Sequence, residues 1–292
     1  MAIAESELVL NSDGSVYHIK LKPEHIADNV IIVGDPHRVE MISNYFDEIE
    51  VKISNREFTT HTGVNGNTRI TVMSTGIGTD NIDIVINELD AAVNIDLETR
   101  EIKEVHKSLN IVRLGTSGAL QADIEVDSFV LSEYGLGLDG MLHYYDYPND
   151  LIEQSMTGAF IKQTEWGTQL PRPYIVKASE SLMDKLGDGM ARGITATAPG
   201  FYGPQGRILR LPVRHPNQNE SFTNFSFEGS RITNYEMETS ALYGLGRMLG
   251  HNTCTICTII ANRLAKKYSE DYQISVDKMI RLVLDRLAVE NK

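Results

Sequence analysis

The chain has 292 residues, of which 41% are apolar, and its formal net charge is −13. This length and apolar content are sufficient for one large core, so we expect residues 1–292 to form a single α/β domain. The negative charge argues against nucleic acid and anionic membranes as partners, although a local group of arginines can still bind a small anion.

The first segment, residues 1–16, is expected to be an N-terminal extension and not a targeting signal. It begins MAIAESELVL, with acidic residues where a signal peptide carries basic ones. No apolar run approaches the roughly 20 residues that a membrane helix requires. Only two cysteines are present, which fits a reducing compartment. We therefore predict a soluble, cytoplasmic protein.

Strand-like and helix-like segments then alternate to the end of the chain. Short apolar runs typical of buried strands are NVIIV (Asn29–Val33), TRITVMS, NIVRLG, SFVLSEYG, PYIVKAS, GITATA and CTICTIIA. Helices are predicted over 36–46, 79–94, 236–249 and 276–289. This alternation favours a mainly parallel or mixed sheet covered by helices. The charged stretch Asp96–Asn110 resembles an exposed helical insertion.

Two patterns are not interpreted as functional sites. GLGLDG (Gly135–Gly140) matches a dinucleotide-binding pattern, but the residues that follow are aromatic and contain a proline, so no suitable helix is expected to begin there. Cys254 and Cys257 lie in a strand-like run at a spacing that points them to opposite faces. Without a second cysteine pair they are expected to be core residues and not zinc ligands.

Two loops that follow predicted strands have the character of anion sites. In VGDPHRVEMI, Asp35 can cap a helix that begins at Pro36, and Arg38 lies in the first turn, where backbone N–H groups favour an anion. RLGTSGAL combines Arg113 with the hydroxyls of Thr116 and Ser117 between flexible glycines. Taken alone, each is also compatible with an ordinary capped helix or tight turn.

Two further segments suggest that a nucleoside is bound. GFYGPQGR carries Phe201, Gln205 and Arg207, which can stack on a planar base and pair with the O2/N3/O4 edge of uracil. In NYEMETS, an extended backbone would place Glu236 and Glu238 on one face, where both could accept hydrogen bonds from ribose hydroxyls. The competing interpretations are a surface loop for the first segment and a helix-capping role for one glutamate in the second.

In chain order, GDPHRVE, NREFTT, STGIG, RLGTSGAL, GFYGPQGR, NYEMETSALY and IIANR resemble the motifs of the nucleoside phosphorylase family of the purine/uridine type. The resemblance spans about Tyr17 to Arg263 and is strongest to the uridine-cleaving members. It implies a three-layer α/β/α sandwich around a mixed, partly barrel-like sheet. It also implies a pentosyltransferase that converts uridine and phosphate reversibly to uracil and ribose 1-phosphate, as in pyrimidine salvage.

The resemblance also assigns roles to the candidate residues. Phosphate would be bound by Gly34, Arg38, Arg113 and Thr116, with Arg56 reaching it from a neighbouring subunit. Ribose would be held by Glu236, Met237 and Glu238, and by His18 of the neighbour. The base would be bound by Phe201, Gln205 and Arg207, with Ile260 lining its pocket. Arg113, Gln205, Arg207 and Glu238 would act directly in catalysis.

The same resemblance bears on assembly, cofactors and competing functions. Sites shared between subunits imply a homo-oligomer, at least a dimer. Phosphate is a co-substrate, and no cofactor is implied. Some relatives bind a monovalent cation at the dimer interface with a glutamate and a serine. This chain has Glu57 in place of the glutamate but Asn81 in place of the serine, so no metal is predicted. Purine-cleaving relatives carry an aspartate where this chain has Asn262. A purine phosphorylase, a nucleosidase that uses water and a non-catalytic nucleoside-binding protein remain as alternatives.

Overall fold

The computed structural model describes residues 2–148 and 150–288. The described strands are β1 (Asn29–Val33), β2 (Glu48–Asn55), β3 (Phe58–Asn65), β4 (Thr68–Ser74), β5 (Ile95–Asp96), β6 (Glu101–Ile102), β7 (Asn110–Ala119), β8 (Phe129–Gly137), β9 (Tyr174–Lys177), β10 (Ala191–Thr197), β11 (Ser226–Phe227), β12 (Ser230–Glu236), β13 (Asn252–Asn262) and β14 (Lys267–Tyr268). The described helices are α1 (Pro36–Ser43), α2 (Thr79–Asn94), α3 (Leu151–Gln163), α4 (Glu180–Leu186), α5 (Gln218–Asn224), α6 (Thr239–Met248) and α7 (Tyr272–Ala288), with 3-10 helices η1 (Pro23–His25), η2 (Met141–Tyr144) and η3 (Gly203–Gln205).

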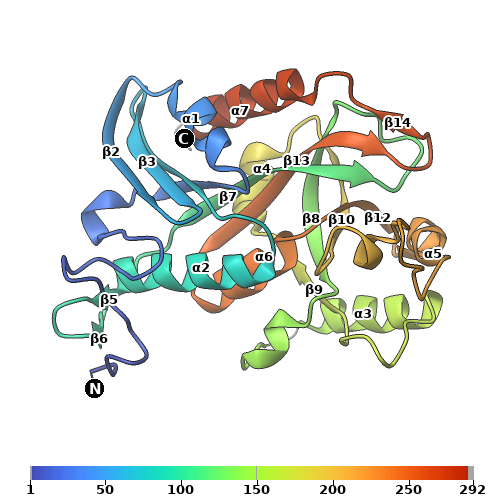
Figure 1. The fold of residues 1–292 in the computed structure, drawn as a ribbon, viewed down its shortest axis with the longest axis horizontal. Coiled ribbons are helices and arrows are strands. Elements are labelled where there is room, and N and C mark those ends of the chain that lie inside the picture. The colour runs from blue at the N-terminus through green and yellow to red at the C-terminus, as the bar shows by residue number, and fades with distance from the viewer. Residues whose placement is uncertain (1, 149, 289–292) are drawn as a thin grey trace.

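A mixed sheet forms the centre of the fold (Figure 1). Its strand order is β11-β12-β10-β8-β13-β7-β1-β4-β3-β2, and β12 also pairs with β7 through Tyr235 opposite Gly118. This additional pairing closes β7, β13, β8, β10 and β12 into a barrel. The rest of the sheet continues from β7 as an open extension. The predicted mixed, partly barrel-like sheet is therefore confirmed.

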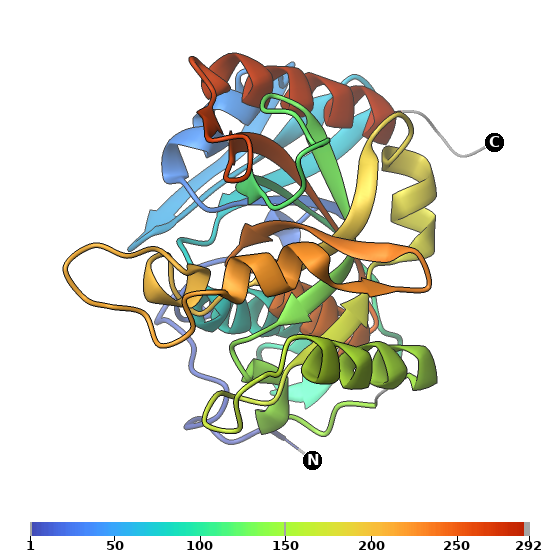
Figure 2. The same cartoon turned by 90° about the vertical axis from the view of Figure 1, so that its right-hand side faces the viewer.

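Helices cover the sheet on two sides. α2 and α6 pack against each other on one side, and α1 and α7 lie on the other, where α7 also contacts α4 (Figure 1). In the side view α7 lies at one edge of the molecule and α3 at the opposite edge (Figure 2). The apolar stripe of α2, which includes Ile82, Val85 and Leu89, is fully buried, so hydrophobic burial fixes this helix against the sheet.

The sequence predicted some element boundaries correctly and others incorrectly. The bounds of β1, β4 and α2 agree with the prediction, whereas the insertion Asp96–Asn110 is not helical. It begins with a small hairpin in which Ile95 pairs with Ile102, although most of it is exposed as expected. The helix expected from Glu236 begins only at Thr239, because Glu236 still belongs to β12. The last helix begins at Tyr272, and its predicted end at position 289 lies outside the described residues.

Within the described chain, no helix is both long and apolar enough to cross a membrane.

Candidate active site

A pocket of about 770 Å³ lies where β1, β4, β7 and β13 end at their carboxyl sides, which is where α/β folds commonly bind ligands. Most of the predicted site residues meet there. Those that line the pocket are Gly34, Arg38, Arg113, Thr116, Phe201, Gln205, Arg207, Glu236, Met237, Glu238 and Ile260. His18 and Arg56 are the two predicted residues that do not line it.

One end of the pocket is formed by the start of α1 and by β7. Asp35 caps α1 by accepting a hydrogen bond from the backbone N–H of His37 at 2.9 Å, and Pro36 occupies the first turn, as predicted. Arg38 donates from Nη1 to the Leu114 carbonyl at 3.1 Å. Burial and the nearby charge of Arg113 lower the pKa of Arg38. Within the described residues Arg38 forms no ion pair, so its charge is available to an anion at this end of the pocket.

Arg113 lies at the centre of the pocket and is buried between two carboxylates. Its Nη2 donates to Glu238 Oε2, and its Nη1 lies 3.4 Å from Glu236 Oε2. Burial alone would lower the pKa of the arginine, but Glu238 and Glu236 together raise it above the ordinary value. The guanidinium is therefore a permanently charged group that links the two glutamates.

The two glutamates have different surroundings. Glu236 accepts hydrogen bonds from the Thr197 hydroxyl at 2.6 Å and from the backbone N–H groups of Glu238 and Thr239 at 2.9 Å each. It therefore caps the start of α6, which is the capping role that the sequence left open for one glutamate. Glu238 accepts from the Gly78 N–H at 2.8 Å and pairs with Arg113. Glu238 is thus the carboxylate with more remaining capacity for a ligand.

Gly115 and Cys257 pack against the Arg113 guanidinium. A Cβ at Gly115 would lie 2.1 Å from Arg113 Nη1 and 2.9 Å from Cys257 Sγ, so only glycine leaves room for the guanidinium. The Cys257 thiol lies 3.6 Å from Arg113 Nη1, and burial raises its pKa to about 11. Cys254 and Cys257 are both buried free thiols, as predicted from their position in a core strand.

The other end of the pocket is organised around Gln205. Its Oε1 accepts hydrogen bonds from Arg207 Nη1 at 2.5 Å and Arg263 Nη2 at 3.0 Å. The Arg207 guanidinium lies over the Phe201 ring at 3.7 Å from its centroid. Burial and the charge of Arg263 lower the pKa of Arg207 to about 10. No carboxylate of the described chain forms an ion pair with either arginine, so this end carries uncompensated positive charge.

Two functional candidates here were not identified from the sequence. Arg263 clamps Gln205, and Tyr235 lines the pocket with its ring 5.1 Å from the Arg263 guanidinium. Both residues belong to quoted motifs, NYEMETSALY and IIANR, and Arg263 follows a buried strand directly. The position of Arg263 at the end of a buried strand could have marked it as a site residue. Its contact with Gln205 could not be predicted, because it depends on how the barrel brings the two segments together.

Asn262 does not face the pocket. Its Nδ2 donates to the carbonyls of Gln121 at 2.9 Å and Ile124 at 2.7 Å, and its Oδ1 accepts from the Ala265 N–H at 2.9 Å. The side chain is buried and is used to fix two loops. In this structure the local role of Asn262 is therefore structural.

His18 and Arg56 lie together outside the pocket. His18 Nδ1 is hydrogen-bonded to Glu88 Oε1 at 2.6 Å, and Asn55 Nδ2 donates to the His18 carbonyl at 2.7 Å. The exposed Arg56 guanidinium lies over the Tyr17 ring at 5.5 Å from its centroid. These side chains therefore form a group at the surface. Arg56 directly precedes Glu57, which does line the pocket.

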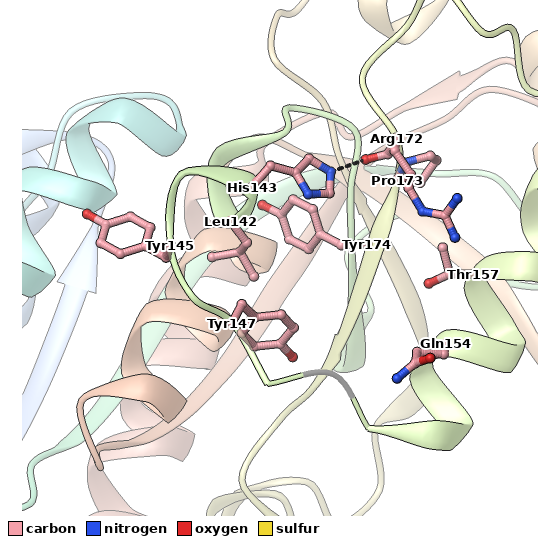
Figure 3. Close-up of a pocket in the computed structure, with 9 residues that line it drawn as sticks. All are labelled: Leu142, His143, Tyr145, Tyr147, Gln154, Thr157, Arg172, Pro173 and Tyr174. Carbon is pink, nitrogen blue, oxygen red and sulfur yellow. Dashed lines mark hydrogen bonds between the residues drawn. The ribbon is translucent and has the colours of Figure 1, made fainter.

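The GLGLDG segment also forms no cofactor loop. After Gly140, whose φ is +82°, the chain forms the short η2 and not a longer helix. Figure 3 shows the residues that follow lining a separate pocket of about 310 Å³, in which His143 Nε2 donates to the Arg172 carbonyl at 2.7 Å. This pocket shares no lining residue with the candidate active site.

Comparison with known proteins identifies the family. The profile of the phosphorylase superfamily matches residues 28–288. The chain is 31% identical over 267 residues to the uridine phosphorylase of Thermococcus kodakarensis, covering 88% of this chain and 81% of that protein. It is 27% identical to a DeoD-type purine nucleoside phosphorylase of Clostridium perfringens, covering 92% and 97%. A Trypanosoma brucei nucleoside phosphorylase that shows uridine phosphorylase activity superposes with a TM-score of 0.87 at 30% identity, covering 96% and 99%.

Proposed function

Because this chain belongs to the phosphorylase superfamily and is a pentosyltransferase of the nucleoside phosphorylase family, we propose that it converts uridine and phosphate reversibly to uracil and ribose 1-phosphate. Its relatives include enzymes named for uridine and for purine nucleosides, so the choice of base has to be argued from the pocket.

The observation that carries this proposal is the clamp on Gln205. Two arginines, Arg207 and Arg263, hold its amide oxygen, and neither pairs with a carboxylate of the described chain. Uracil presents two carbonyl acceptors on either side of one N–H donor, which suits a site rich in donors with one amide oxygen. Purine departure would gain from an acid that protonates the base, and Asn262 is directed away from the pocket.

We propose that, when the base binds, the hydrogen bond between Arg207 and Gln205 is replaced by hydrogen bonds from both residues to the base. Arg207 would move from Gln205 Oε1 to uracil O4, and the vacated lone pair would accept from N3–H. Gln205 Nε2 would donate to O2, while Arg263 would continue to hold Oε1. The amide would then be oriented before the substrate arrives, which lowers the ordering cost of binding.

The chemistry follows from these positions. As phosphate approaches C1′, the C1′–N1 bond breaks with its electron pair passing to the uracil, and a new C1′–O bond forms to phosphate. Negative charge therefore grows on the base, where Arg207 would stabilise it. A well-placed donor contributes about 3–4 kcal/mol to such a step. Arg38, Arg113 and Thr116 would hold phosphate beneath the sugar, and Glu238 and Met237 would hold ribose.

Glu236 is proposed to act by positioning and not by contact with ribose, because its oxygens already accept from Thr197, Glu238 and Thr239. His18 and Arg56 are proposed to complete the site of a neighbouring subunit, which makes the protein a homo-oligomer, at least a dimer. No cofactor beyond the co-substrate phosphate is required by this scheme. We place the protein in the cytoplasm, in pyrimidine salvage.

Release of uracil from uridine, measured with and without phosphate, tests the reaction class. Uracil should appear only when phosphate is present, together with one ribose 1-phosphate for each uracil. Release that does not depend on phosphate would identify a nucleosidase. Uridine binding without any release would identify a binding protein.

A further inference from the structure

A second cavity, of about 660 Å³, lies beside the loop that carries the base-binding residues. One wall is formed by Leu138, Trp166, Leu170 and Pro171, and the other by residues 199–218. Figure 2 shows the part of this segment between η3 and α5 as a long loop that extends away from the body. The cavity shares one lining residue, Arg207, with the candidate active site.

The cavity combines apolar walls with positive charge. Its lining includes Leu209, Leu211 and Val213, and Leu209 and Leu211 are 73% and 80% exposed. Exposed apolar groups gathered around a cavity of this size are typical of a ligand site, since such sites commonly have volumes of roughly 300–1,000 Å³.

The positive charge of the segment 199–218 is unusual in a chain that is acidic overall. Residues 199–218 contain Arg207, Arg210 and Arg214 and no carboxylate, although the whole chain has a net charge of −13. Arg207 donates to the Phe201 carbonyl and to Gln205, and Arg214 donates to Gln169 Oε1. Within the described residues none of the three arginines forms an ion pair, so each retains its charge for a ligand.

We propose that this cavity binds an amphiphilic carboxylate, with a medium-length aliphatic chain against the apolar walls and its carboxylate on Arg210 and Arg214. Removing the aliphatic chain from water would supply most of the affinity. Charge-assisted hydrogen bonds from the arginines would select an anion over a neutral molecule of the same length.

Occupation of the cavity would also affect the active site through Arg207. Because Arg207 lines this cavity as well as the candidate active site, a bound ligand would restrict the movement of its guanidinium toward the base. The ligand should therefore raise the KM for the nucleoside. This consequence rests on the proposed function, whereas the binding itself does not.

The chain offers a direct probe, because Trp166 is its single tryptophan and lines the cavity. Decanoate should change the tryptophan fluorescence of the full-length protein saturably, with one site per chain. Neutral 1-decanol should bind at least about tenfold more weakly, because it cannot form the charge-assisted hydrogen bonds to Arg210 and Arg214. The double variant Arg210→Gln/Arg214→Gln should weaken decanoate binding at least about tenfold, and Arg281→Gln, a surface arginine on α7, should not.

Three results would overturn the proposal: no saturable change with decanoate, equal binding of decanol, or unchanged binding by the double variant. Binding of vesicles of anionic lipid without binding of monomeric decanoate would instead identify the loop as a membrane contact and would also refute it. An enzyme that cleaves uridine but ignores decanoate would refute this inference alone. Decanoate binding without uridine cleavage would refute the proposed function alone.

Discussion

The guanidinium of Arg113 and the carboxylate of Glu238 form an ion pair with both side chains buried at the centre of the pocket. In the proposed reaction these two residues serve different substrates, since Arg113 binds phosphate and Glu238 binds ribose. The pair would thus lie at the point where the two substrates meet. Glu236, the last residue of β12, lies 3.4 Å from Arg113 Nη1 and also accepts a hydrogen bond from the Thr239 N–H at the start of α6.

Replacing Arg113 by methionine should destabilise the fold in a manner that depends on pH. Removing one partner of a buried ion pair costs about 3–5 kcal/mol. Burial raises the pKa of Glu236 and Arg113 opposes this rise, so the pKa should be higher still in the variant. A carboxyl with a raised pKa in the folded state contributes stability while protonated and loses it as pH rises through that pKa.

The free energy of unfolding of Arg113→Met and wild type, measured with urea over a range of pH, tests this. The difference between them should be largest at neutral pH and should shrink toward the ordinary glutamate pKa of about 4.3. A difference that is constant over this range would contradict the assignment of Glu236 as the responsible group.

Replacing Gly115 by alanine should impair phosphate use and should also cost stability, because Arg113 would be pushed out of its buried ion pair. The added Cβ would lie 2.1 Å from Arg113 Nη1 and 2.9 Å from Cys257 Sγ, so the guanidinium would have to move. We expect the KM for phosphate to rise about tenfold, equivalent to roughly 1.4 kcal/mol of binding. Gly158→Ala is the matched control, because its Cβ would meet no atom within 4 Å on the exposed face of α3. Equal phosphate kinetics in the two variants would contradict the proposed role of Arg113.

Sequence patterns predicted the strands and motifs that depend on local order. β1, β4 and α2 are continuous apolar runs or regular amphipathic stripes, and the cap at Asp35 follows from neighbouring residues. The closure of the barrel by β12 and β7 depends on residues far apart in the chain, and so does the clamp of Arg263 on Gln205. The insertion Asp96–Asn110 was misjudged because charged residues favour exposure without distinguishing a hairpin from a helix.

Converting Asn262 to aspartate should destabilise the protein and should not create a purine enzyme. Its Nδ2 donates to two backbone carbonyls, and a carboxylate in that place would face both acceptors without a donor. We expect the free energy of unfolding to fall by about 1–3 kcal/mol. Thermal unfolding and assays with inosine test this, and a stable variant that gains inosine cleavage would show that position 262 reaches the base.

Mixing two inactive variants tests whether subunits share sites. If Arg56 completes the neighbour's pocket, a dimer of Arg56→Asn and Arg113→Ala subunits contains one intact site. Asparagine is chosen because Arg56 has a φ of +55°, which asparagine tolerates well. Random exchange in a dimer should restore roughly a quarter of wild-type activity. Arg38→Ala mixed with Arg113→Ala is the control, and recovery in neither mixture despite subunit exchange would exclude shared sites.

The central claim is that Gln205, held between Arg207 and Arg263, selects a pyrimidine base. The most direct measurement compares kcat/KM for uridine, inosine and adenosine with the wild-type protein and saturating phosphate. A site built around such buried hydrogen bonds rejects the wrong ligand by about 10⁴-fold. We predict that uridine is preferred over both purine nucleosides by a factor of this order, and faster cleavage of inosine or adenosine than of uridine would contradict the claim.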